Sequence, residues 1–420
     1  MSVIRLSASR PSTAAASSPV LASLEKRIDG YFHNYPDGHV TCGRAPRAGD
    51  IELASNDYLV LAGDRRIVEA QSKALQASEA GPYMSGVFIQ YLSTQRTLER
   101  RFATFFGYED AVLCQSGFVA NEGLMQAIAG PDIPVYLDMY VHASMEQGVR
   151  AAGAPLHRFR HNRPEHLRLM IGRHGPGVVA VDSLYSTGGD FCDLEGLIAV
   201  CEETGSILVV DESHAVATTG ARGEGLVASR GLQDKVPFIT FSLSKGFVGR
   251  AGLIAASSRF VEYFRYESRP AIFSSAILPW EVTRFAKTLD IIERAGPVRE
   301  RLHANAAYLR AGLVAAGYDI GESVSQIIPL VAGTEANTAR LAKALEDEGI
   351  IGSVFCAPAT PKNRAMVRFC VNQALNQAAL DRVIEACARV RENLFDPSWP
   401  CFRGTEDRVA PPSQVTAAAG

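Results

Sequence analysis

Short runs of apolar, mostly β-branched residues alternate with amphipathic stretches between about residues 65 and 260. Such alternation of buried strands and helices predicts an α/β fold, with a mostly parallel central sheet and helices on both faces. In this architecture ligands collect beyond the carboxyl ends of the strands. Polar residues that follow the strands are therefore the first site candidates. The strand runs are AVLC at 111–114, VYLD at 135–138, VVAVD at 178–182, ILVVD at 207–211 and FITFS at 238–242.

The last third of the chain predicts a smaller α+β domain. A chain of 420 residues exceeds what one core usually supports, so a second domain is expected. A long helical pattern at about 279–315 would bridge the two domains. Strand-like runs at 325–331, 352–356 and 366–372 precede a helix at 380–393. An amphipathic helix near 22–35 would pack on this domain and make it discontinuous.

The predicted domain boundaries follow from these patterns. Both ends lack apolar periodicity and are expected to be disordered, and a transit peptide is the less favoured interpretation of the first twenty residues. We predict a tail at 1–20, an N-terminal segment at 21–60, a large domain at 61–295, a small domain at 296–400 and a second tail at 401–420.

Composition narrows the class of partner. With 42 basic and 45 acidic residues and a net charge of -3, the chain has no field that favours nucleic acid or an anionic membrane. No run of 18 apolar residues exists, so no membrane span is predicted. Eight cysteines are scattered without CxxC or Cys/His clusters, which argues against a metal site or a disulfide framework and favours the cytoplasm. Small molecules are therefore the expected partners of this chain.

Lys245 follows the strand at 238–242, with Ser242 three positions before it. A Ser-x-x-Lys string also serves as a nucleophile motif in hydrolases, so it leaves two chemistries open. Asp211 ends another strand and precedes His214, although a helix N-cap would explain an isolated aspartate here. Pyridoxal phosphate needs this combination, because an acid keeps its ring nitrogen protonated and a lysine carries the Schiff base.

The segment QSGFVANEG at 115–123 is a candidate phosphate site. It follows a strand and opens a helical pattern, so the amides of Gly117 and Phe118 would face an anion. An ordinary turn capped by Ser116 explains the same pattern. Further candidate donors to the phosphate are Ser242, Ser274 and Ser275.

His142 lies just beyond the strand at 135–138. A lone histidine is usually a core or surface residue, but at a strand end it would also suit stacking over a planar ring. The turn after the strand at 178–182 adds further polar candidates, which are Asp182, Tyr185, Ser186 and Asp190.

Six motifs in one order resemble the α-oxoamine synthase family: SNDYL at 55–59, SGFxAN at 116–121, HAS at 142–144, YSTGGD at 185–190, DESH at 211–214 and SLSK at 242–245. These are fold-type I pyridoxal-phosphate enzymes that condense an amino acid with an acyl-CoA and release carbon dioxide. The resemblance covers roughly residues 25–395.

Further segments look like the α-hydroxyketone quorum-sensing autoinducer synthases of this family. They are RHGPGVVAVDSLYST at 173–187, PAIFSSAILPWE at 270–281, SQII at 325–328 and GSVFCAPATPKN at 352–363. Biotin- and threonine-pathway members usually carry a glycine-rich, Arg-containing stretch where this chain has GPYMSGVFIQYLS at 81–93. The autoinducer branch shares this departure, and the resemblance therefore assigns no thioester contacts here.

The resemblance implies roles for the candidate residues. Lys245 would carry the Schiff base and later move the Cα proton, and Asp211 would hold the ring nitrogen. His214 would bond the phenolic oxygen, and His142 would stack on the ring. The edge of the ring would be lined by Ser186 and Asp182, the latter one methylene shorter than the usual Glu. Gly117, Phe118 and Ser242 would hold the phosphate.

The resemblance also implies an obligate homodimer, because Ser274 or Ser275 would reach the phosphate from a neighbouring subunit. Arg368 in MVRFCVN matches the arginine that clamps the substrate α-carboxylate, and Asn56 would assist it. A planar two-pronged donor suits a carboxylate better than lysine does. A surface salt bridge is the alternative for Arg368.

The implied reaction is a decarboxylating condensation that yields an α-amino ketone, a precursor of a hydroxyketone signal. By resemblance the amine donor would be S-adenosylmethionine or 2-aminobutyrate, and the acyl donor a medium-chain acyl-CoA. The alternatives are another α-oxoamine synthase that uses glycine, alanine or serine, a noncatalytic partner subunit, and an aminotransferase. Noncatalytic partners typically lack the lysine, so Lys245 argues against that alternative.

Overall fold

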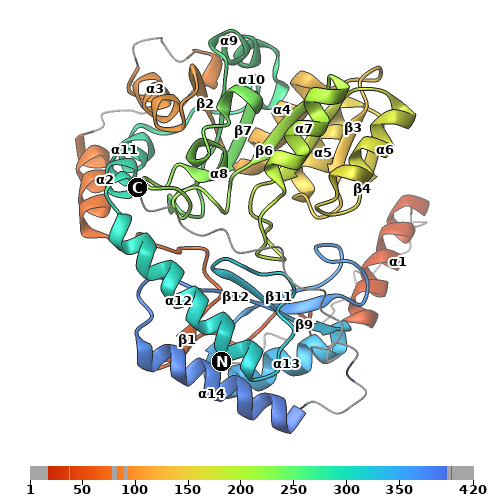
Figure 1. Cartoon of the computed structure of the whole chain (residues 1–420), viewed down its shortest axis with the longest axis vertical. Helices are drawn as coiled ribbons and strands as arrows, with labels where there is room; N and C mark the ends of the chain where they lie inside the picture. Colours follow the sequence, from red (N-terminus) through yellow and green to blue (C-terminus); the bar gives the residue numbers. More distant parts are fainter. Residues whose placement is uncertain (1–17, 37, 78–82, 89–92, 395–398, 400–420) are drawn as a thin grey trace.

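The computed structural model of the chain describes residues 18–36, 38–77, 83–88, 93–394 and 399. Two lobes are visible, a larger one built on a twisted sheet and a smaller one below it in the view of Figure 1. The predicted tail at 401–420, and all but the last three residues of the predicted tail at 1–20, lie outside the described residues.

The large lobe contains a mostly parallel sheet, as predicted. Its strand order is β2-β8-β7-β6-β5-β3-β4, and β8 is the strand of this sheet that runs against its neighbours. The strands are β2 (Asp110–Cys114), β3 (Val135–Asp138), β4 (Leu156–Phe159), β5 (Val178–Asp182), β6 (Ile207–Asp211), β7 (Phe238–Ser242) and β8 (Gly252–Ala256).

Strands β3, β5, β6 and β7 coincide with the predicted runs because they are apolar on both faces. Along β5, Val179 and Val181 belong to one apolar cluster, whereas Val178 and Ala180 belong to the cluster on the other face. Side chains of a strand alternate between faces, so this sheet is buried on both sides. Strand β4 was not predicted, because LHRF is half polar and lies at the sheet edge.

Helices cover both faces of this sheet (Figure 1). Two of them, α4 and α5, follow β2 and β3 within a few residues and begin near the strand ends where ligands collect. The helices of this lobe are α2 (Arg65–Ala77), α3 (Thr94–Phe106), α4 (Gly117–Ile128), α5 (Ala143–Ala152), α6 (Pro164–His174), α7 (Leu194–Thr204), α8 (Gly225–Ser229), α9 (Ser258–Glu267), α10 (Arg269–Ile272) and α11 (Pro279–Glu293), with short 3-10 turns at Gly86–Phe88 and Gln233–Lys235.

The small lobe contains an antiparallel sheet with the order β11-β12-β9. A second pairing, parallel between β1 and β10, ties the N-terminal segment to this lobe. The strands are β1 (Ile51–Glu52), β9 (Ile327–Gly333), β10 (Ile350–Ile351), β11 (Ser353–Phe355) and β12 (Ala365–Cys370), and the helices are α12 (Gly296–Ala315), α13 (Glu335–Asp347) and α14 (Gln377–Leu394).

The prediction of one continuous helix at 279–315 is wrong. Helix α11 ends at Glu293, and α12 begins at Gly296 with Pro297 in its first turn. Proline lacks the N–H that a continuous helix requires, so a helix starts there readily but does not continue through it. Figure 1 shows α11 beside α2 in the large lobe and α12 descending to the small lobe. The bridge is therefore α12 alone.

The predicted packing of the N-terminal helix on the small lobe is also wrong for the isolated chain. Helix α1 (Pro19–Asn34) has no buried side chain, and it stands at the flank of the small lobe in Figure 1. Its apolar side chains, among them Val20, Ile28 and Phe32, are exposed by 74%, 45% and 63%. Its apolar face thus lacks a partner among the described residues.

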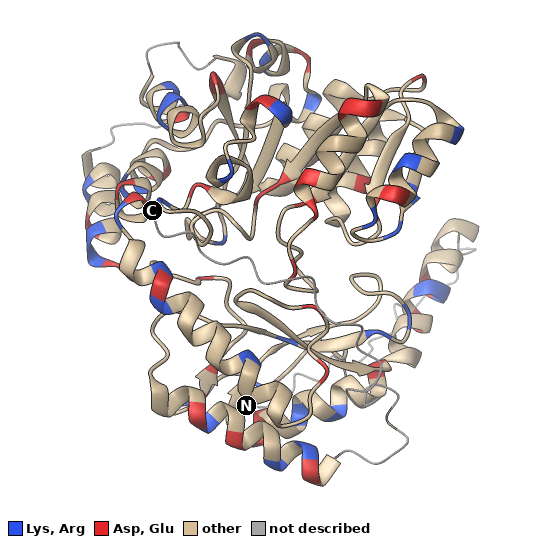
Figure 2. Ribbon diagram, in the orientation of Figure 1, with Lys and Arg blue, Asp and Glu red and all other residues tan. Residues whose placement is uncertain are grey.

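Charged residues of both signs are dispersed along the ribbon of both lobes (Figure 2), in keeping with the near-neutral composition. No described helix is both long enough and apolar enough to span a bilayer.

Candidate active site

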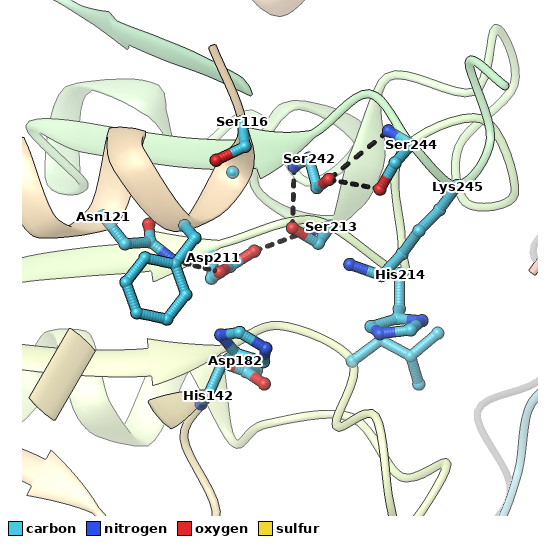
Figure 3. Close-up of a pocket in the computed structure, with 13 residues that line it drawn as sticks. Ser116, Asn121, His142, Asp182, Asp211, Ser213, His214, Ser242, Ser244 and Lys245 are labelled. Carbon is cyan, nitrogen blue, oxygen red and sulfur yellow. Dashed lines mark hydrogen bonds between the residues drawn. The ribbon is translucent and has the colours of Figure 1, made fainter. Parts of the chain in front are cut away.

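A cavity of about 240 Å³ opens at the carboxyl ends of the parallel strands. Figure 3 shows side chains from β5, β6 and β7 and from the starts of α4 and α5 converging on it. Most of the predicted cofactor residues line it, namely Ser116, Gly117, Phe118, His142, Asp182, Asp211, His214, Ser242 and Lys245. Lining residues that were not predicted are Asn121, Leu184, Ser213 and Ser244.

Asp211 is the last residue of β6 and is held by two donors. Asn121 Nδ2 donates to its Oδ2 at 2.7 Å, and the Ser213 amide donates to its Oδ1 at 2.9 Å. Asn121 was present in the SGFxAN motif without a role, and the structure gives it one as the partner of Asp211. Its own Oδ1 is buried and has no hydrogen-bond partner in the described structure, so this acceptor is available to a bound group.

Lys245 lies in the loop after β7, at the rim of the same cavity. Burial lowers the pKa of its ammonium below the ordinary lysine value, although the charges of Asp211 and Asp182 oppose that shift. A lysine with a lowered pKa more readily provides the free amine that a Schiff base requires. The predicted lysine therefore lines the cavity, in an environment that favours its free amine.

His142 caps the N-terminus of α5 and faces the cavity. Its amide donates to Asp182 Oδ1 at 3.2 Å, and its Nδ1 lies 2.7 Å from Ser144 Oγ. Burial lowers the pKa of His142, which favours a neutral planar ring. Burial, followed by the charge of Asp211, raises the pKa of Asp182 well above its usual range. Asp182 at the cavity thus tends to be uncharged.

His214 comes from the turn after β6 and is buried. Its Nδ1 lies 2.7 Å from the hydroxyl of Tyr58, which is itself fully buried. Burial, together with the charges of Lys245 and Arg368, lowers the pKa of His214 well below its usual range. The ring is therefore neutral. Tyr58 belongs to the SNDYL motif, yet its sequence position alone gave no indication of this contact.

The start of α4 approaches β7 very closely. Ser116 caps the helix by accepting a hydrogen bond from the Val119 amide at 3.1 Å. A Cβ atom at Gly117 would lie 2.6 Å from the Cβ of Ser242, so only glycine fits this contact. Ser242 Oγ lies 2.7 Å from Ser244 Oγ. Amides of a helix N-terminus beside hydroxyl groups form a site suited to a phosphate.

Ser274 and Ser275 do not line the cavity within this chain. Ser274 Oγ donates to Gln115 Oε1 at 2.7 Å, and the Ser275 carbonyl accepts a hydrogen bond from the amide of the same side chain. Their segment lies directly beyond β2 and next to Phe273, which is 83% exposed. The predicted contact across a subunit interface stays a prediction.

Arg368 contacts both Asn56 and Ser186, and none of the three lines the cavity. Arg368 lies on β12, and its Nη1 donates to the Ser186 carbonyl at 2.8 Å while its Nη2 donates to Asn56 Oδ1 at 3.1 Å. The guanidinium lies over the Phe355 ring, 4.3 Å from its centroid. Its Nε is buried with no partner in the described structure. A fixed, buried cation with an unused N–H is suited to a carboxylate.

His161, which was not predicted, stabilises the turn that carries Ser186. Its ring bridges two carboxylates, with Nδ1 3.0 Å from Asp138 Oδ1 and Nε2 2.9 Å from Asp190 Oδ2. Burial alone would lower the pKa of His161, but the hydrogen bonds to Asp138 and Asp190 outweigh it and raise the pKa to about 9. The turn is thus fixed by a charged imidazolium.

These residues fit pyridoxal phosphate. The close approach at Gly117 brings the start of α4 beside Ser242, the unpaired Asn121 Oδ1 marks a place for a polar group, and Lys245 and Asp211 share one cavity. The fold and the site together define a fold-type I pyridoxal-phosphate enzyme.

Comparison with known proteins agrees with this class. The family model for class I and II aminotransferases matches residues 48–387. The CAI-1 autoinducer synthase of Vibrio campbellii is 40% identical over 374 residues, which span 88% of this chain and 95% of that protein. A putative 8-amino-7-oxononanoate synthase of Bacillus mycoides is 32% identical over 81% of this chain and 87% of its own length.

A solved structure has the same fold. It is a serine palmitoyltransferase from S. paucimobilis with a bound pyridoxal-phosphate–myriocin aldimine, at 25% identity and a TM-score of 0.79, covering 89% of this chain and 97% of that chain. The chain belongs to the α-oxoamine synthases within the class I and II aminotransferase family. It is a pyridoxal-phosphate-dependent acyltransferase.

Proposed function

We propose that the enzyme condenses a medium-chain acyl-CoA with an amino acid and releases CoA and carbon dioxide. The product would be an α-amino ketone that serves as a precursor of an α-hydroxyketone autoinducer. The amine donor would be S-adenosylmethionine or 2-aminobutyrate. The similarity to the CAI-1 autoinducer synthase supports this branch. The observation that carries the proposal is a buried Arg368 with an unused Nε beside the cavity of Lys245.

When bound, pyridoxal phosphate supplies an electron sink for negative charge at the substrate Cα. Asp211, oriented by Asn121, would hold a proton at the ring nitrogen. Lys245 would bind the cofactor and later take the Cα proton, since its lowered pKa provides the free amine at a lower pH than for an ordinary lysine. The neutral ring of His142 would cover one face.

The remaining side chains would position the two ends of the cofactor and the substrate. The start of α4, from Ser116 to Phe118, would bind the phosphate together with Ser242. Asp182 and the turn with Ser186 would border the ring. Arg368 would bind the substrate α-carboxylate, with Asn56 holding the guanidinium in place. The carboxylate bound there is also the group that leaves as carbon dioxide.

A homodimer is part of the proposal. Phe273, next to Ser274, is 83% exposed, and Phe88 in the turn that contacts this segment is 67% exposed. Large apolar side chains that are exposed near one another are typical of a protein interface. The second copy would cover them and place Ser274 or Ser275 near the other subunit's phosphate. Light scattering should give a dimer mass, and a monomer at assay concentration would contradict this part.

The cytoplasm is the proposed compartment. The described cysteines carry free thiols, which suits a reducing environment.

Substrate identity is tested with purified enzyme loaded with pyridoxal phosphate. The enzyme is supplied with mixed acyl-CoAs and a panel of amino acids, and CoA release and product mass are measured. The proposal predicts turnover with S-adenosylmethionine or 2-aminobutyrate and an α-amino ketone product. Robust turnover with glycine, alanine or serine alone would favour another α-oxoamine synthase. Turnover with a keto acid and no thioester would indicate an aminotransferase.

A further inference from the structure

Two side chains of the SNDYL segment connect Arg368 with His214 by hydrogen bonds. Arg368 Nη2 donates to Asn56 Oδ1 at 3.1 Å, and the Tyr58 hydroxyl lies 3.2 Å from the same oxygen. The hydroxyl is also 2.7 Å from His214 Nδ1, although 156 residues separate the two in sequence. The residue that would bind the substrate carboxylate therefore shares a network with a residue that lines the cofactor cavity.

The Tyr58 hydroxyl has one proton and two neighbours that accept hydrogen bonds. Asn56 Oδ1 already has other donors, which are Arg368 Nη2 and the thiol of Cys370 at 3.5 Å. Among the described residues, Tyr58 is the only hydrogen-bond partner of His214 Nδ1. This nitrogen is also the nearer acceptor, because it lies 2.7 Å from the hydroxyl whereas Asn56 Oδ1 lies 3.2 Å from it. Tyr58 can donate to Asn56 Oδ1 only over the longer of the two distances, so the geometry favours donation of its proton to His214.

The position of this proton decides what His214 presents to the cavity. Burial lowers the pKa of His214, so the ring is neutral and carries one N–H. If Tyr58 donates to Nδ1, the N–H is at Nε2 and the ring offers a donor. In the opposite arrangement Nδ1 carries the proton and Nε2 offers only a lone pair. A partner of one ring nitrogen thus sets the function of the other.

We propose that Tyr58 is a positioning residue that donates to His214 Nδ1 and holds His214 as the Nε2–H tautomer, ready to donate to the phenolic oxygen of pyridoxal phosphate. The inference rests on the proposed function, in which His214 faces that oxygen. Tyr58 acts through His214 and does not touch the reacting atoms.

A measurable consequence follows for the Schiff base between Lys245 and the cofactor. A hydrogen bond to the phenolic oxygen withdraws negative charge that otherwise stabilises the protonated Schiff base. Without the Tyr58 hydroxyl, His214 can adopt either tautomer, and its hydrogen bond to the phenolic oxygen becomes weaker. The pKa of the Schiff base therefore rises. The titratable or charged groups around His214 and Tyr58 are Lys245, Arg368, His142 and Cys370.

The first test is a pH titration of the visible absorbance of the pyridoxal-phosphate-loaded enzyme. Tyr58→Phe should raise the midpoint by about 0.5 to 1 pH unit. His214→Gln should shift it in the same direction, and the double variant should match His214→Gln alone, because Tyr58 acts only through His214. Tyr108→Phe is the matched control, since its hydroxyl donates to the Val236 carbonyl away from the cavity. An unshifted Tyr58→Phe midpoint, or additive shifts, would overturn the inference.

The second test does not depend on any variant of Tyr58 being stable. Imidazole ¹⁵N shifts of His-labelled wild-type enzyme, assigned with His214→Gln, should show the proton of His214 at Nε2. A proton at Nδ1 would overturn the inference even if the titration midpoints shift. If the wild-type enzyme shows no visible Schiff-base absorbance, the proposed function fails instead, while the ¹⁵N shifts still test the tautomer.

Discussion

The side-chain amide of Asn121 donates to the Asp211 carboxylate at 2.7 Å, joining the first turns of α4 to the end of β6. The same nitrogen lies 2.9 Å from Ser144 Oγ on α5. Three elements therefore fix one carboxylate at the bottom of the cavity.

Asp211→Asn should lower kcat by at least about 100-fold while the cofactor still binds, because an amide cannot keep the ring nitrogen protonated. Asn121→Ala retains the acid and loses only its orientation, so it should cost about tenfold. Steady-state kinetics combined with the visible spectrum separates loss of chemistry from loss of cofactor. Near-normal turnover of Asp211→Asn would refute the assigned role.

Arg368→Lys should raise KM for the amino acid by about 10- to 100-fold and change kcat much less, because lysine keeps the charge but loses the planar two-pronged donor. Arg364→Lys provides a control, since Arg364 is exposed and lies near the start of the same strand. Kinetics with saturating acyl-CoA measures both variants. If KM stays at the wild-type value in Arg368→Lys, the substrate carboxylate binds elsewhere.

Gly117→Ala should weaken pyridoxal-phosphate binding by about tenfold or more. The added methyl group would lie 2.6 Å from the Ser242 side chain, so the start of α4 must move away from β7. Cofactor titration of the apoenzyme gives the dissociation constant. Gly172→Ala is the control, because a Cβ there meets no atom within 4 Å. Equal affinity in the two variants would argue against a phosphate site at Gly117.

Stability should fall in alkaline solution through His161. Its folded-state pKa of about 9 exceeds the ordinary value of 6.5. A raised pKa means that the contribution to stability is complete below about pH 6.5 and is lost as the pH rises through about 9. Between about pH 7 and pH 10 the wild type should lose roughly 2 kcal/mol more free energy of unfolding than His161→Gln. Urea titrations measure this difference, and parallel pH profiles would contradict it.

The parts of the fold that sequence predicts best are those with a purely local cause. Strands β3, β5, β6 and β7 are apolar on both faces, so their ends, and with them Asp182, Asp211 and Ser242, are found from pattern alone. Strand β4 is half polar because it lies at the edge of the sheet. The break before α12 depends on one proline, Pro297. Their boundaries are therefore less visible in the pattern.

Two contacts between distant segments escaped prediction. Tyr58 and His214 are 156 residues apart, and Arg368 reaches the Ser186 carbonyl across 182 positions. Neither spacing nor composition indicates such a pair, because each depends on how the two lobes pack. Family resemblance pointed to Arg368 and Ser186, but only the structure shows that Ser186 meets Arg368 through its backbone oxygen.

The central claim is that Lys245 carries the cofactor in this cavity. Borohydride reduction of the loaded enzyme, followed by peptide mass spectrometry, locates the lysine directly because it fixes the Schiff base covalently. The account predicts a phosphopyridoxyl group on the peptide with Lys245, and its absence in Lys245→Ala. A reduced group on a different lysine, or an unmodified Lys245 in fully loaded enzyme, would contradict it.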